Sequence, residues 1–171
     1  MKKIILFVFL FVVFCSTSSL KVEAYTKSIS TDLVQTLQNN LICINYETML
    51  SARNSIQFSF VLDNNYSHVM GYRAEANYRW YLRDVFPVRT TGIEGFNIGP
   101  YGAVGMYVWD NPYTEKTESD FYFEIGGTVA YKWVFSGFQV EPLLKLSIPL
   151  VKESYAKNFY WGFGVSLGYA W

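Results

Sequence analysis

Large apolar residues occupy every second position over much of this chain, and the pattern is sharpest at the C-terminal end. Between Phe159 and Trp171, aromatic and aliphatic residues alternate with small or polar ones. A period of two is typical of an extended strand, whose successive side chains point to opposite faces. One face of this strand is wholly hydrophobic and the other is nearly bare. The segment therefore suits the wall of a small barrel with lipid outside and a narrow lumen inside.

The same alternation predicts six further strands upstream of the C-terminal one. Their approximate residue ranges are 41–49, 55–63, 71–82, 94–109, 121–135 and 138–148. In the third of them, Tyr78 and Trp80 face one way, whereas Arg79 and Tyr81 face the other. Seven strands are thus expected from periodicity alone.

An eighth strand is expected because bacterial single-chain barrels contain an even number of strands. The remaining segment is 27–38, in which Ile29, Thr31, Leu33 and Leu37 share a face. We predict a strand here, which also places both chain ends on the same side; a short helix over 32–41 is the alternative. The predicted fold is all-β, an eight-stranded antiparallel transmembrane up-and-down β-barrel whose first strand is the weakest prediction.

The connections fit this topology in part. Segments 63–68, 110–120 and 149–158 are expected outside the cell, and 50–54 and 135–137 are expected as tight periplasmic turns. Segment 83–93 also falls on the periplasmic side, although it is too long for a typical short turn there.

The N-terminus has the composition of a secretory signal peptide. Lys2 and Lys3 precede an unbroken apolar run over 4–15, and Val22-Glu23-Ala24 is a plausible cleavage site. A membrane anchor is the alternative, but the run is much shorter than the roughly 20 residues that a spanning helix needs. We predict a cleaved signal peptide over 1–24 and a single barrel domain over 25–171.

Alternation alone does not say which face is outside, because a soluble lipocalin-like barrel alternates with its apolar face inward. Two features favour lipid on the apolar face. The opposite face is rich in Gly, Ala and Ser, as a crowded lumen requires, and aromatic residues gather near strand ends, where an interfacial girdle would lie. These aromatic residues are Tyr78, Trp80, Trp109, Trp133, Trp161 and Trp171.

Composition excludes some classes of protein. After removal of the signal, about 11 basic and 13 acidic residues remain, a net charge near −2, which argues against a nucleic-acid partner. Cys43 is the single cysteine left, so no intramolecular disulfide is expected. No stretch after Ala24 approaches a helical membrane span, which leaves the closed barrel as the form a membrane protein could take.

Charged residues fall on the face assigned to the lumen, four acids and four bases. They are Glu47, Arg73, Glu75, Arg79, Glu124, Lys132, Glu141 and Lys145. They could line an ion pathway, but an eight-stranded barrel is just wide enough for side chains to fill it. Because buried ions are tolerable only when paired, we predict a structural network of charges that closes the lumen.

Several segments resemble a family of small bacterial outer-membrane barrels of unknown function, within the wider group of OmpA- and OmpX-like eight-stranded barrels. The resemblance rests on Tyr78-Arg79-Trp80-Tyr81, on the run from Gly95 to Tyr101, on Glu141-Pro142 and on the aromatic last residue. It covers roughly 40–171. It implies an eight-stranded barrel in the outer membrane and brings no catalytic residues.

The resemblance also implies that the terminal strand is recognised by the barrel assembly machinery, after delivery by periplasmic chaperones. The corresponding outward stripe here is Phe163, Val165, Leu167, Tyr169 and Trp171.

Enzyme chemistry is not expected. His68 is the single histidine and lies beside Ser67, but adjacent strand residues point to opposite faces, so the two would not converge as a nucleophile and base must. The sequence carries no zinc, calcium or phosphate-loop motif, so no metal or cofactor is expected. We predict a monomeric barrel with a structural or surface-interaction role, whose loops contact lipopolysaccharide or host factors. The alternatives are a narrow channel and a lipid-modifying enzyme.

Overall fold

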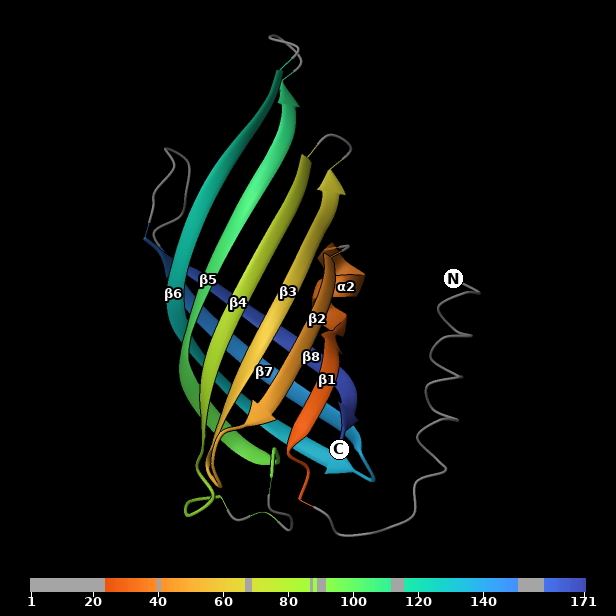
Figure 1. Cartoon of the computed structure of the whole chain (residues 1–171), viewed down its shortest axis with the longest axis vertical. Coiled ribbons are helices and arrows are strands. Elements are labelled where there is room, and N and C mark those ends of the chain that lie inside the picture. Colours follow the sequence, from red (N-terminus) through yellow and green to blue (C-terminus); the bar gives the residue numbers. More distant parts are fainter. Residues whose placement is uncertain are drawn as a thin grey trace, which may run out of the picture.

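The computed structural model describes residues 24–39, 41–66, 69–86, 88, 92–111, 116–150 and 159–171. These residues form a closed antiparallel barrel in which each strand pairs with its sequence neighbour and β1 pairs with β8 (Figure 1). The predicted signal peptide, apart from Ala24, lies outside the described residues. Ser67 and His68 also lie outside them.

The eight strands confirm the predicted all-β fold. Their bounds are β1 Lys27–Asp32, β2 Leu41–Met49, β3 Asn54–Tyr66, β4 Val69–Tyr81, β5 Gly95–Asn111, β6 Lys116–Phe135, β7 Phe138–Pro149 and β8 Tyr160–Ala170. The loop predicted over 110–120 is wrong at both of its ends. The ladder of β5 and β6 continues to Asn111↔Lys116, because paired polar residues can extend two strands beyond an apolar band.

The strand predicted over 27–38 is wrong in its second half. β1 ends at Asp32 and the chain turns into a short helix, α2 (Leu33–Asn39), as the alternative reading of this segment proposed. Asp32 caps the helix: its carboxylate accepts a hydrogen bond from the backbone N–H of Gln35 at 3.1 Å, and its carbonyl accepts one from the Thr36 hydroxyl at 2.7 Å. Within the described part of the chain, no helix is long and apolar enough to cross a membrane.

The two faces of the wall differ sharply in polarity. Large apolar side chains are exposed on the outside, as at Phe58 (51%), Phe123 (48%) and Phe163 (52%). Charged and polar side chains are buried inside, as at Arg79 and Glu141. This is the reverse of a soluble protein, in which charged residues are rarely fully buried.

The barrel is closed at the end where Tyr25 and Trp171 lie, which we call the closed end. At this end, Gly92 forms a parallel bridge with Tyr25, and the Ile93 N–H donates to the Tyr25 carbonyl at 2.8 Å. Gly92 has a φ of 127°, and a Cβ on it would lie 2.1 Å from the Tyr25 oxygen, so glycine is required. Ile93 is fully buried against Tyr81, Val134 and Ala170. Gly92 and Ile93, at the end of segment 83–93, therefore form a floor at the closed end of the lumen.

The opposite end, which we call the open end, has walls of unequal height. β6 has 20 residues and β5 has 17, whereas β1 has six. In Figure 1 the β5–β6 hairpin rises far above the side formed by β1, β2 and β8, where α2 lies. β8 pairs with β1 only from Ala170 to Ser166, so the upper half of β8 extends past the end of β1.

Candidate functional site

All eight charged residues predicted for the lumen lie on the inward face, and the structure divides them into two layers. Glu47, Arg79, Lys132 and Glu141 form a layer near the closed end, which we call the closed-end quartet. Arg73, Glu75, Glu124 and Lys145 lie nearer the open end and form the open-end set.

The closed-end quartet consists of two bases and two acids in mutual contact. Arg79 Nη1 lies 3.0 Å from Glu47 Oε2 and 2.6 Å from Glu141 Oε1. Lys132 Nζ pairs with Glu47 and lies 3.4 Å from Glu141 Oε2. Each charge therefore has two opposite charges beside it, and the quartet is neutral as a whole. All four side chains are at most 1% exposed.

Neutral side chains add hydrogen bonds to Glu47 and Arg79 of the quartet. The hydroxyls of Tyr81 and Ser55 donate to Glu47 Oε1 at 2.7 Å and 2.5 Å, and Arg79 Nη2 donates to Gln57 Oε1 at 2.5 Å. Charges removed from water are stabilised only when both pairing and hydrogen bonds compensate the lost hydration. The quartet meets the first condition fully and the second in part, since Arg79 Nε and Glu141 Oε2 are buried without a hydrogen bond.

The quartet spans the whole lumen. Glu47 lies on β2 and Lys132 on β6, four strands away in a ring of eight, so this pair joins opposite walls. Arg79 on β4 reaches Glu141 on β7 across three strands. An eight-stranded barrel holds little more than its own side chains. The quartet and the floor beneath it therefore block the lumen at the closed end.

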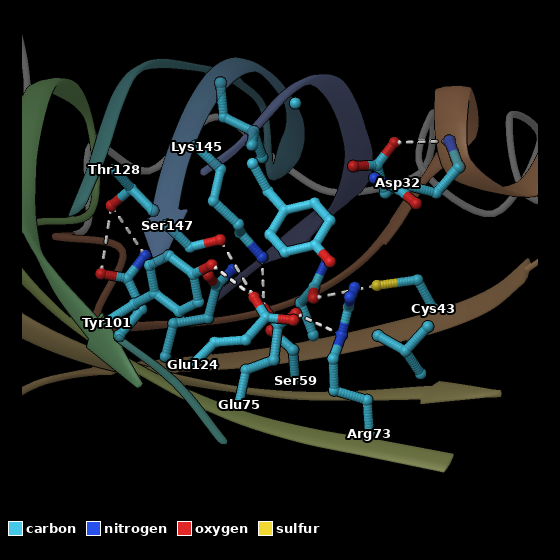
Figure 2. A pocket seen from close by; sticks show the side chains of 18 of the residues that line it. Asp32, Cys43, Ser59, Arg73, Glu75, Tyr101, Glu124, Thr128, Lys145 and Ser147 are labelled. Atoms are coloured by element: carbon cyan, nitrogen blue, oxygen red, sulfur yellow. Dashed lines mark hydrogen bonds and ion pairs between the residues drawn. The ribbon is translucent and has the colours of Figure 1, made fainter. Parts of the chain in front are cut away.

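Above the quartet, the lumen contains a cavity of about 440 Å³ whose deepest charged side chain is Arg79. Figure 2 shows Lys145, Glu75 and Glu124 converging on its middle. Lys145 Nζ lies 2.5 Å from Glu75 Oε2, and Arg73 Nε lies 2.8 Å from Glu75 Oε1. Glu75 is thus held by two cations.

Glu124 is held differently from Glu75. Its Oε2 accepts hydrogen bonds from the hydroxyls of Tyr101 and Ser147, both at 3.0 Å, and both donors are neutral. Lys145 Nζ lies 4.7 Å from the centre of the Tyr101 ring, a cation–π distance. Both sets contain two acids and two bases, but Glu124 accepts its hydrogen bonds from neutral hydroxyls.

Aromatic and neutral residues of the cavity were not singled out from the sequence. Tyr107 and Tyr122 stack with their ring centres 5.3 Å apart, and the Asn77 amide donates to the Thr128 hydroxyl at 2.9 Å. The alternation in the sequence predicts that these residues face the lumen. It does not predict which of them lie close together, because that depends on strand register. Register is not encoded in periodicity.

Among the described residues, no group of three or more His, Cys, Asp or Glu side chains is placed to hold a metal ion. Cys43 is buried beside Leu41 and Val61, and its thiol contacts the Asn45 side-chain oxygen at 3.4 Å. Ser67 and His68, which are expected to point to opposite faces, lie outside the described residues.

The C-terminal stripe lies on the outside of β8 and just beyond it. Phe163 and Trp171 are about half exposed, and Val165, Leu167 and Tyr169 are partly buried between neighbouring outward side chains. The backbone of Trp171 is tied to the start of the barrel: its N–H donates to the Lys27 carbonyl at 2.9 Å, and its carbonyl accepts from Thr26 at 3.0 Å.

Comparisons with known proteins support the architecture. No family model matches the sequence, and no curated protein matches it either. Among solved structures, the chain is similar to the N-terminal β-barrel domain of Pseudomonas aeruginosa OprF, with a TM-score of 0.54 and 12% identity over 86% of this chain and 98% of that one. At this identity the similarity shows the fold alone. The eight-stranded architecture implied by the resemblance is confirmed, whereas no family match supports the smaller family within it.

Proposed function

We propose that this protein is a small, monomeric outer-membrane β-barrel with a structural or surface-interaction role and no catalytic activity. The observation that carries the proposal is the inverted polarity of the wall, with exposed Phe and Ile side chains outside and a buried ion quartet inside. An exposed apolar surface of this extent needs lipid to cover it. A closed barrel is the β-structure that satisfies its backbone within lipid.

The dimensions of the wall support the same proposal. The 11 residues of β8, at about 3.3 Å each, extend about 36 Å, or about 28 Å in height at a tilt of roughly 40°. This matches the roughly 25 Å apolar band of outer-membrane barrels. Two aromatic pairs, Tyr78–Trp80 and Tyr131–Trp133, lie near the closed end, where an interfacial girdle is expected. In this proposal the signal peptide over 1–24 directs export and the closed end faces the periplasm.

The test is fractionation of cells that produce the full chain, followed by conductance measurements on the purified barrel. We expect recovery in washed outer membranes, heat-modifiable gel mobility and no steady conductance in planar bilayers, because the quartet blocks the lumen. Recovery in the soluble periplasmic fraction would contradict the membrane placement. Steady single-channel conductance would favour a channel instead.

We also propose that the barrel assembly machinery recognises the stripe that ends at Trp171. Deletion of Trp171 should then strongly lower the amount of barrel in the outer membrane, because the chain loses both the terminal aromatic side chain and the backbone groups that bond to Thr26 and Lys27. Immunoblots of outer-membrane fractions measure this. Trp171→Phe, which keeps an aromatic end and the backbone bonds, is the matched control and should assemble normally. Equal membrane levels of the deletion variant and the parent would refute the assembly role.

A further inference from the structure

The barrel wall is incomplete on one side of the open end. β1 pairs with β2 no further than Ser30↔Asn45 and with β8 no further than Asp32↔Ser166. Beyond these points the upper parts of β2 and β8 have no strand of β1 between them, and α2 occupies the gap. Gln35 of this helix lines the cavity, whereas Leu37 is 67% exposed. We call this gap, bounded by α2 and the upper half of β8, the side opening.

The cavity reaches the outer surface of the barrel at the side opening. Nearly all of the described strand residues that line the cavity are at positions whose side chains face the lumen. The two exceptions are Trp161 and Phe163, which are at outward-facing positions on the upper half of β8. Trp161 is 71% exposed. Gly162, between them, faces open space, since a Cβ on it would meet no atom within 4 Å. The polar cavity and the apolar outer surface are therefore continuous across β8.

The interior of the cavity offers partners for both signs of charge. Arg73, Arg79 and Lys145 are basic, and Glu75, Glu124 and Asp32 are acidic. Glu75 is 8% exposed and held by Arg73 and Lys145, while Glu124 is held by neutral hydroxyls. A headgroup that carries one positive and one negative group matches this lining, because the positive group can pair with Glu124 and the negative group with Lys145. A purely anionic headgroup would offer Glu124 no positive partner.

We propose that the side opening admits a single-chain zwitterionic amphiphile of the lysophospholipid class. Its headgroup lies in the cavity near Glu124 and Lys145, and its acyl chain passes out beyond α2 over the upper half of β8, at Trp161 and Phe163, into the surrounding lipid. The cavity volume of about 440 Å³ lies within the range of small-molecule sites. The inference rests on the membrane placement proposed above, because the acyl chain needs an apolar surrounding on the outer side.

The experiment measures binding of palmitoyl-lysophosphatidylcholine to the purified barrel by native mass spectrometry and titration calorimetry. The parent should bind one molecule. Gly162→Leu fills the side opening from a position with free space, and it should weaken binding at least about tenfold. The matched control is Gly127→Leu on β6, where the nearest atom to a new Cβ is also distant, at 3.7 Å, and it should bind as the parent does. Equal binding by the parent and Gly162→Leu would overturn the proposal.

Three further comparisons separate the contribution of the acyl chain from that of the headgroup. Trp161→Ala removes an outward contact without adding bulk, so it should also weaken binding, and it tests the site even if Gly162→Leu does not fold. Glycerophosphocholine, which has no acyl chain, should not bind measurably; binding as tight as that of the lysophospholipid would rule out the side opening. Lysophosphatidylglycerol should bind at least about tenfold more weakly, and equal affinity would overturn the zwitterion assignment. A barrel that is recovered in the outer membrane but binds no lysophospholipid overturns this inference and leaves the proposed function intact.

Discussion

Replacing Arg79 with alanine lowers the free energy of unfolding by about 3–5 kcal/mol. The change leaves Glu47 and Glu141 with one shared cation, Lys132, in an interior where every member of the quartet is at most 1% exposed. An unpaired buried charge loses its hydration without compensation. Urea titration of the barrel refolded in lipid vesicles, followed by tryptophan fluorescence and gel mobility, measures the loss.

A surface arginine supplies the matched control for this experiment. Arg53 also pairs with a carboxylate, Asp84, at 2.7 Å, but the two side chains are 64% and 71% exposed. Arg53→Ala should therefore cost no more than about 1 kcal/mol. Combining Arg79→Met with Glu47→Gln restores neutrality and leaves the Lys132–Glu141 pair, so the double variant should recover part of the stability. Equal losses for Arg79→Ala and Arg53→Ala would show that the quartet is not a coupled buried network.

Replacing Val129 with arginine destabilises the barrel in lipid vesicles by about 2–4 kcal/mol. Val129 lies on the outside of β6, paired with Ile98 on one side and Leu144 on the other. Trp133 of the closed-end girdle is four residues away, which corresponds to about 10 Å of height for a tilted strand. Val129 is therefore near the middle of a band about 25 Å tall, where a guanidinium is most costly.

The control is an equally apolar residue outside the band. Leu50 lies in the β2–β3 turn and is 58% exposed, so Leu50→Arg should change the free energy of unfolding by no more than about 0.5 kcal/mol. Unfolding titrations of both variants in lipid vesicles measure the two changes in the free energy of unfolding. If Val129→Arg proves as mild as Leu50→Arg, the outer face does not contact hydrocarbon and the membrane placement fails.

The positions of the strands, and the face on which each side chain lies, could be predicted because the alternation of apolar and polar residues continues along each strand. Trp133 and Lys132, for example, fall on opposite faces in the structure as alternation predicts. The helix after β1 was only the alternative prediction for its segment, because the even strand number expected of a barrel outweighed a local signal. That signal was Asp32, a favoured capping residue placed directly before Leu33-Val34-Gln35.

The partners within the lumen could not be predicted from the sequence. Glu47 and Lys132 are 85 residues apart, and they meet only because strand register and tilt bring them to the same height on opposite walls. Periodicity fixes the face of a residue but not its height. The burial of Ile93 could not be predicted for a similar reason. The floor forms only when the end of segment 83–93 contacts Tyr25, which precedes β1 and is distant in the sequence.

The short seam between β1 and β8 has a kinetic consequence. Every other pairing in the barrel joins neighbouring strands through a connection of modest length, whereas the seam joins residues about 140 positions apart and extends only from Ser28↔Ala170 to Asp32↔Ser166. Closing so large a loop costs more entropy than forming a hairpin, and few ladder bonds compensate for it. The hairpins therefore form first and the seam forms last, so the pairing of β1 with β8 limits the rate at which this barrel folds.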